Sequence, residues 1–143
     1  MTIEEVVFDL LSTAQGVRSL VGLRIYPVQT EESAEFPFVI YQEAENVPAL
    51  THDGAGDSDR HSMDIDVWAL DYPEAKRLAR AVRKALHGFR GRRRGCFVQG
   101  IFLRSEADQH ELPQTAEERG AFGVTMNFEL WFRPVETGVT HGG

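Results

Sequence analysis

The chain has 143 residues, of which 42% are hydrophobic, and a formal net charge of −7 at pH 7. That length suits one domain with a hydrophobic core, and the acidic balance argues against a protein whose main task is to coat phosphate backbones, since that task needs a positive field. Cys96 is the single cysteine, so an intrachain disulfide and a cysteine-cluster metal site are excluded. No apolar run approaches the roughly 20 residues of a membrane span, so we expect no membrane partner.

The N-terminal third predicts a helix, a short extended segment and a strand. Thr2 and Glu5 have capping-box spacing, and the apolar residues that follow recur with helical period, so we predict a helix that ends at Gly16. A further short turn could follow it, before a brief extended segment at 24–27. An aromatic and β-branched run over 36–44 then predicts a strand.

Residues 48–60 contain glycine, proline and aspartate without periodicity, which predicts a long exposed loop between two strands. Its aspartates and nearby histidines suggest a metal site. Their spacing does not match the Ca²⁺ loop, which needs oxygen ligands at fixed alternate positions and a closing glutamate. A mobile acidic loop is therefore the better interpretation.

The segment 63–88 predicts a strand followed by an amphipathic helix, and the rest of the domain is expected to pack around this unit. Apolar residues alternate along the strand with Asp64, Asp66 and Trp68, so one face of the strand is core and the other is not. Asp71 is the predicted N-cap of a helix over 72–87, in which the apolar residues gather on one stripe.

The C-terminal part predicts two more strands. An arginine-rich segment at 89–95 precedes a strand over 96–106, where strict alternation places Phe97, Gln99, Ile101 and Leu103 on one side. A polar connection over 107–120 leads to the clearest alternation of the chain, over 121–133. Residues 135–143 carry no pattern and are predicted to be disordered.

These elements predict a single α+β domain over residues 1–134. It has about four strands in a mainly antiparallel sheet, with an N-terminal helix and a central helix at 72–87 packed on it.

The order and spacing of several short motifs resembles the tail completion, or tail terminator, proteins of long-tailed bacteriophages, prophages and gene transfer agents. The motifs span about residues 3–133 and are GLRIYP at 22–27, an aromatic strand from Phe36, DVWA at 66–69, the central helix, and FELWF at 128–132. The resemblance implies a structural subunit without enzymatic activity that forms a ring, commonly of six copies, on the head-proximal end of the tail tube. There the ring terminates tube polymerisation and meets the neck.

The resemblance also implies the partners and the location. The partners are other copies of the chain, the major tail tube protein and a head completion or neck protein, while DNA passes through the lumen without sequence-specific binding. The location is the virion tail or neck, with assembly in the host cytoplasm, and no cofactor is implied. Within such a ring, the acidic loop is expected to face the lumen or the tube. Deleting the loop is expected to spare folding but impair tail joining. The candidate residues of the loop are His52, Asp53, Asp57, Asp59 and Arg60.

Aromatic and charged side chains are predicted on the sheet face opposite the core, and such a mixture is typical of a subunit interface. Alternation adds Tyr41, Phe102 and Asp64 to this set. The alternative is that the N-terminal helix covers this face as a second core layer. The interface candidates are Asp66, Trp68, Arg104, Glu129, Trp131 and Arg133.

Two basic clusters remain. The outer face of the central helix carries five basic residues: Lys76, Arg77, Arg80, Arg83 and Lys84. This face is either a solvated surface or a contact with an acidic neighbouring subunit. A second cluster is either an exposed turn or a phosphate contact: Arg90, Arg92, Arg93 and Arg94.

Nothing in the sequence favours catalysis. Asp64 and Asp66 point the same way, but catalytic carboxylates also need a pocket and a partner acid or metal. Cys96 is predicted to be a small buried or edge residue. The alternative functions are a head-tail adaptor of the neck, a small nucleic-acid-binding domain that uses both basic clusters, and, more distantly, a small hydrolase.

Overall fold

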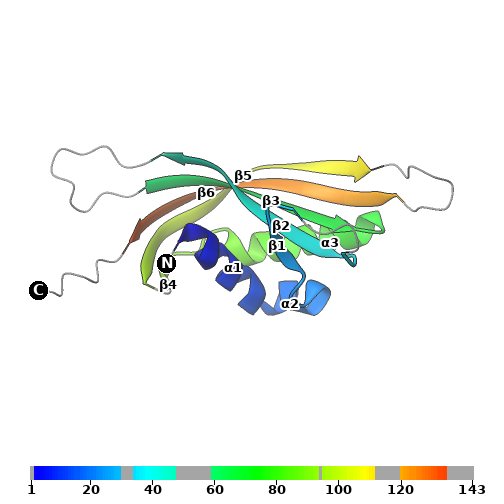
Figure 1. Ribbon diagram of the computed structural model, residues 1–143, viewed down its shortest axis with the longest axis horizontal. Coiled ribbons are helices and arrows are strands. Elements are labelled where there is room, and N and C mark those ends of the chain that lie inside the picture. Colours follow the sequence, from blue (N-terminus) through cyan, green and yellow to red (C-terminus); the bar gives the residue numbers. More distant parts are fainter. Residues whose placement is uncertain (1, 30–33, 48–58, 94, 112–119, 135–143) are drawn as a thin grey trace, which may run out of the picture.

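The computed structural model describes residues 2–29, 34–47, 59–93, 95–111 and 120–134 (Figure 1). Its helices lie together on one side of a long twisted sheet. In chain order the elements are α1 (Ile3–Thr13), α2 (Gln15–Val21), β1 (Ile25–Pro27), β2 (Phe38–Val47), β3 (Asp59–Ala69), α3 (Tyr72–Leu86), β4 (Gly91–Arg93), β5 (Cys96–Glu111) and β6 (Ala121–Pro134).

The described residues form a sheet of six strands in the order β1-β2-β3-β6-β5-β4. Every neighbouring pair is antiparallel except β1 and β2, which are parallel. The predicted class is confirmed, and the predicted number of about four strands is corrected to six. The two additional strands, β1 and β4, are three residues long, which is too short for alternation to distinguish them from turns.

Two bulges in β5 explain why simple alternation was wrong there. The register shifts between Val98 and Gly100 and again between Leu103 and Ser105, and each extra residue reverses which side the following side chains face. Val98 and Ile101 are therefore both buried in the core, whereas Phe97 faces the other side.

Several element boundaries also differ from the sequence prediction. The strand β3 begins at Asp59, so Asp59 and Arg60 pair with β6 and do not belong to the loop. The strand β5 continues to Glu111, well into the predicted connection. Only the first few residues of β5 pair with β4, and beyond Leu103 no described strand pairs with the free edge of β5. The helix α1 ends at Thr13, and Gly16 lies inside α2.

The predicted helix ends are otherwise confirmed. Thr2 and Glu5 form a complete capping box at the start of α1. At the start of α3 the Asp71 carboxylate accepts from the backbone N–H of Glu74 at 2.8 Å. The helix α3 is followed by Gly88 with φ of 85°, a left-handed conformation that favours glycine.

One hydrophobic core fills the space between the sheet and the helices. The apolar stripes of α1 and α3 pack on the same sheet face, where Met63, Ile65 and Val67 meet the inward residues of β6. The alternative that the N-terminal helix covers the opposite face is therefore wrong. Tyr41 also belongs to the core, where its ring centroid lies 6.2 Å from that of Phe8, so its assignment to the opposite face is corrected.

None of the described helices is both long and apolar enough to span a bilayer.

Candidate assembly surfaces

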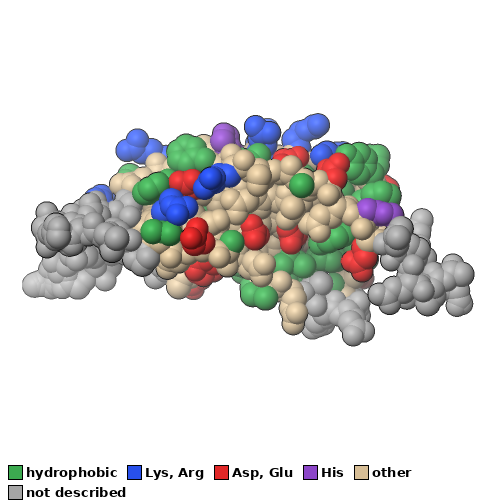
Figure 2. Space-filling model, turned by 90° about the horizontal axis from the view of Figure 1, so that it is seen from above, with side chains coloured by type: hydrophobic (Ala, Val, Ile, Leu, Met, Phe, Trp, Pro, Cys, Tyr) green, Lys and Arg blue, Asp and Glu red, His purple; other side chains and the backbone are tan. Residues whose placement is uncertain are grey.

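The side of the sheet away from the helices, here called the outer face, carries large aromatic and charged side chains in the described part of the chain. Viewed from above, it is a mosaic of hydrophobic, basic and acidic groups (Figure 2). The exposed fractions of Trp131 and Phe102 are 36% and 48%. The structure places the six predicted interface candidates of the sheet on this face: Asp66, Trp68, Arg104, Glu129, Trp131 and Arg133.

Two glycines allow aromatic rings to lie flat on the outer face. A Cβ atom at Gly123 would lie 2.8 Å from Cε3 of Trp68, and one at Gly100 would lie 2.7 Å from Cζ of Phe102. Both distances are shorter than a non-bonded carbon contact. The ring of Trp68 therefore occupies space that a side chain at Gly123 on the neighbouring strand β6 would fill, and the ring of Phe102 occupies space that a side chain at Gly100, two residues earlier on β5, would fill.

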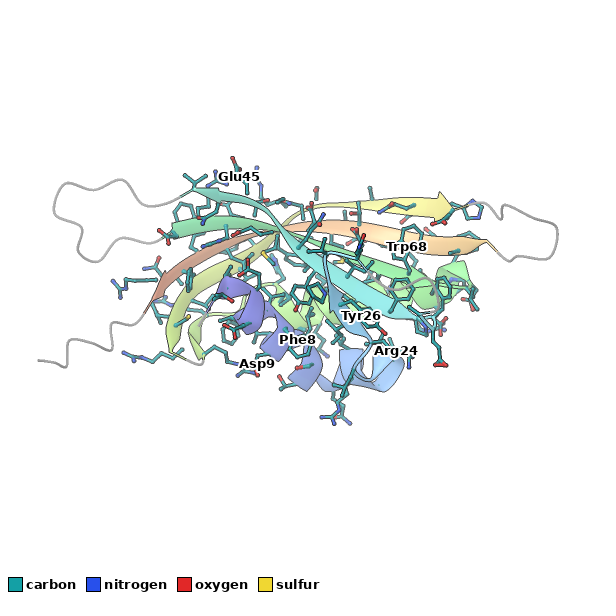
Figure 3. All side chains as sticks on the ribbon, in the orientation of Figure 1. Phe8, Asp9, Arg24, Tyr26, Glu45 and Trp68 are labelled. Atoms are coloured by element: carbon teal, nitrogen blue, oxygen red, sulfur yellow. The ribbon has the colours of Figure 1, made fainter. Side chains whose placement is uncertain are left out.

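The outer face divides into two halves along the strands, and Glu45 and Trp68 mark its opposite ends (Figure 3). In the half near Trp131, Glu129 accepts from Nε1 of Trp131 at 2.8 Å and pairs with Arg104 at 3.2 Å. The guanidinium of Arg133 lies 5.8 Å from the ring centroid of Phe97, a cation–π distance. The charges in this half are thus largely matched within the chain.

The half near Trp68 is aromatic and acidic, and the sequence predicted only part of it. Phe38 lies opposite Trp68 in the register, and its ring contacts those of Tyr26 and Phe36 at centroid distances of 6.2 and 5.1 Å. The run FVIY within β2 is apolar on both sides, so its alternation could not show which side faces outward. The Trp68 half comprises Tyr26, Phe36, Phe38, Ile40, Asp64, Asp66 and Trp68.

Both carboxylates of the Trp68 half are hydrogen-bonded to β6. Nδ2 of Asn127 donates to Asp64 at 2.9 Å, and the Thr125 hydroxyl donates to Asp66. Partial burial raises the pKa of Asp66, the Thr125 hydrogen bond lowers it, and the charge of Asp64 raises it, so that the pKa lies above the ordinary aspartate value. These contacts hold the two carboxylates in place on the outer face.

The basic face of α3 is not uniform. Lys76 bonds Asp108 at 3.0 Å and lies 3.6 Å from Glu106, so its charge is engaged within the chain. Arg77, Arg80 and Lys84 instead border a groove of about 590 Å³ between α2 and α3. Arg83 is exposed on the same helix.

The floor of this groove is apolar. It is formed by Ala14 and Leu20 from one side and by Ala81 and Ala85 from α3. A Cβ at Gly16 would lie 3.6 Å from that of Ala81, so the two helices are close together here. The groove was not predicted, because it depends on the packing of α2 against α3.

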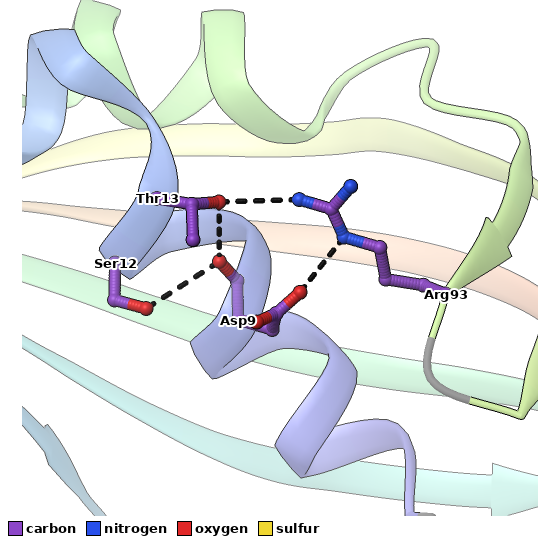
Figure 4. A network of polar contacts seen from close by, with 4 residues as sticks. All are labelled: Asp9, Ser12, Thr13 and Arg93. Carbon is purple, nitrogen blue, oxygen red and sulfur yellow. Dashed lines mark hydrogen bonds and ion pairs between the residues drawn. The ribbon is translucent and has the colours of Figure 1, made fainter.

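Two arginines of the segment 89–95 contact other parts of the domain. Arg93 of β4 donates from Nε to the Asp9 carboxylate at 2.8 Å and from a terminal nitrogen to the Thr13 hydroxyl at 3.1 Å (Figure 4). Arg90 lies 5.8 Å from the ring centroid of Phe97, while Arg92 is exposed. Arg94 lies outside the described residues. A phosphate contact by this segment stays a prediction.

Of the predicted loop residues, His52, Asp53 and Asp57 lie outside the described residues. Asp59 and Arg60 belong to β3, and Arg60 lies 3.6 Å from Glu45. Among the described residues, no three histidine, cysteine, aspartate or glutamate side chains are grouped to hold a metal ion.

The sequence of this chain matches one protein family over nearly its whole length. Residues 5–133 fit the family described as tail completion protein gp17. The chain belongs to this family. The resemblance found in the sequence is thereby confirmed, and the chain is a structural protein of tail assembly.

A solved structure supports the fold of this tail completion protein. A chain of the structure titled "Virion of native gene transfer agent (GTA) particle" aligns with a TM-score of 0.63 at 19% identity, covering 88% of this chain and 90% of that one. A second solved chain aligns with a TM-score of 0.48 at 10% identity, covering 93% of this chain and 99% of that one. Comparison with curated protein sequences gave no match.

Proposed function

We propose that this tail completion protein forms a ring of identical copies on the head-proximal end of the tail tube. The ring stops tube polymerisation and presents a surface to the neck, so its partners are the tube protein and a neck protein. DNA passes through its lumen without sequence-specific binding. The protein is located in the virion tail or neck and assembles in the host cytoplasm.

The observation that carries this proposal is an aromatic sheet face that no described helix covers. The core beneath the sheet is complete, so the exposed Trp131 and Phe102 are not needed to close it. Exposed aromatic side chains interspersed with arginine and carboxylate are typical of the centre of a protein interface. A subunit that functions by shape and charge requires such a face, whereas an isolated monomer does not.

The test is to replace Trp131 by Asp in the producing strain and to image the particles by negative-stain electron microscopy. We expect tubes of uncontrolled length without attached heads, because a carboxylate in a buried interface is costly. An Arg18→Glu variant, changed on the exposed side of α2, serves as the control and should give normal particles.

Two outcomes would contradict the proposal. Particles of normal length and head attachment from a strain that lacks the protein would overturn it. A protein found only between head and neck, with normal tube length in its absence, would identify a head-tail adaptor instead.

A further inference from the structure

The groove between α2 and α3 combines an apolar floor with an unmatched basic rim. Arg77, Arg80 and Lys84 are exposed, and none of them forms an ion pair with another described residue. Lys76, one residue before Arg77, differs from these three because it forms ion pairs with Asp108 and Glu106. In a chain with a net charge of −7, three adjacent cations that form no ion pair with the described residues favour an acidic occupant.

A closed ring of more than two copies needs two different surfaces on each copy. In such a ring every subunit presents one patch to the copy ahead and another to the copy behind. The Trp68 half belongs to the outer face of the sheet. The groove belongs to the helical layer, on the side of α3 away from the stripe that packs on the sheet. The two patches can therefore be occupied simultaneously by two neighbours.

The two patches are also chemically complementary. The Trp68 half offers aromatic rings beside Asp64 and Asp66, and the outward-facing Arg60 and Arg133 lie at the other end of the strands. The groove offers a hollow of small apolar side chains bordered by cations. Aromatic surface against an apolar floor buries area, and carboxylates against the rim fix the orientation.

Building on the ring proposed above, we infer that the α2–α3 groove of one copy receives the Trp68 half of the next copy. The rim of Arg77, Arg80 and Lys84 then faces Asp64 and Asp66 of that neighbour. Asp66 and Trp68 of the candidates predicted on the sheet, and Arg80 and Lys84 of those predicted on the helix, then lie on the two sides of one repeated contact.

Cysteine cross-linking in assembled tails tests this contact. The native Cys96 is 1% exposed and does not interfere. A chain carrying both Asp64→Cys and Arg80→Cys, treated with a short bismaleimide, is expected to give a ladder of species beyond the dimer, because each copy is linked to two neighbours. An equal mixture of the two single variants gives dimers at most, since each copy then has one reactive position.

The matched control replaces Arg80→Cys by Arg18→Cys, which lies on α2 outside the groove. A ladder from the control equal to that from the double variant overturns the inference, and so does the absence of any ladder from tails that contain the protein. Tails from which the protein is missing altogether would instead contradict the proposed function, so the two failures are distinguishable.

Charge reversal provides a second readout that depends on the same pairing. Arg80→Glu and Asp64→Lys should each reduce incorporation into tails by about tenfold or more. Co-expression of the two variants should restore it, because each reversed groove meets a reversed face and each native groove a native face. Circular dichroism of each purified variant verifies folding. Full incorporation of either variant alone, or no recovery on co-expression, contradicts the inference.

Discussion

At the scale of single residues, Trp68 lies where it does because Gly123 has no side chain. The ring fills the space over the neighbouring strand that a Cβ would occupy. An aromatic ring that covers a glycine on an adjacent strand shields backbone that would otherwise be exposed in a sheet. The candidate interface residue and the glycine therefore act as a pair.

We predict that Gly123→Ala lowers the free energy of unfolding by about 1–3 kcal/mol, the usual cost of overpacking. The clash involves Cδ2 and Cε3 at the base of the indole, which cannot move without rotating the whole side chain. Gly100→Ala is the comparison, since there the clash is with the far end of the exposed Phe102 ring. Urea denaturation should show the larger loss at Gly123, and equal losses would contradict this account.

Asp66 makes stability dependent on pH. Folding raises the pKa of this carboxyl group chiefly by burial, so the unfolded chain loses the proton first as pH rises. Its contribution to stability is therefore fully present below the ordinary aspartate pKa of about 3.9 and is lost as pH rises through the higher folded value.

Accordingly, Asp66→Asn should gain stability relative to the wild type as pH rises from about 3 to about 7. Thr125→Val removes a hydrogen bond that favours the ionised form, so it should raise the pKa of Asp66 further. Carboxyl-carbon NMR titration measures that pKa, and a decrease in the Thr125→Val variant would refute the assignment.

At the scale of elements, the side chain of Arg93 joins the last short strand to the first helix. It binds both Asp9 and Thr13 of α1. A basic cluster that suggested phosphate binding thus contributes at least one residue to holding the fold together, and this contact links residues 84 positions apart in sequence.

We predict that Arg93→Ala lowers the free energy of unfolding by about 0.5–1.5 kcal/mol, the usual contribution of a partly buried hydrogen-bonded contact. Amide hydrogen exchange in α1 should accelerate while exchange in β6 changes less. Arg92→Ala, on an exposed side chain, should stay within about 0.5 kcal/mol. A double-mutant cycle with Asp9→Asn that shows no coupling would disprove the link.

The sequence predicted those elements whose signals are local. Helix ends depend on residues close together in the sequence. The predicted start of α1 at Thr2 and Glu5 was correct, and so were the predicted start and end of α3 at Asp71 and Gly88. The bulges of β5 and the strand β4 depend on hydrogen bonds to other strands, which no local pattern records. Gly16 shows the same limit: as a helix stop it was wrong, because α1 ends at Thr13 and Gly16 lies inside α2.

The residues of the candidate surfaces were likewise predictable only where a local pattern identified the side of the sheet. Trp68 and Trp131 sit in strands with strict alternation, so their side of the sheet was correctly predicted. Tyr41 lies in a run that is apolar on both sides, and its assignment failed. The groove between α2 and α3 required the relative placement of two helices, which the basic residues of α3 alone could not reveal.

At the scale of the whole molecule, net charge and local complementarity make opposite predictions for salt. Copies that each carry −7 repel one another at long range, and added salt weakens that repulsion. A contact between the basic groove rim and carboxylates of a neighbour is instead weakened by salt. The sign of the salt effect therefore decides which of the two dominates.

We predict that local contacts dominate and that self-association weakens as salt rises from about 0.05 M to about 0.5 M. Sedimentation of the purified protein, alone and with tube protein, measures this. The Arg80→Glu variant should lose most of the salt dependence, whereas Arg18→Glu should retain it. Association that strengthens with salt would show that general repulsion is the larger effect.

The free edge of β5 affects how two copies of the chain can contact each other. Beyond Leu103 this edge has no partner strand in the described residues, and it bears Glu106, Asp108 and Glu111. The far end of β2 is likewise acidic, with Glu43 and Glu45. Charged side chains along an exposed strand edge disfavour strand-to-strand joining of copies. We therefore expect copies to recognise one another through side-chain surfaces and not by adding strand to strand.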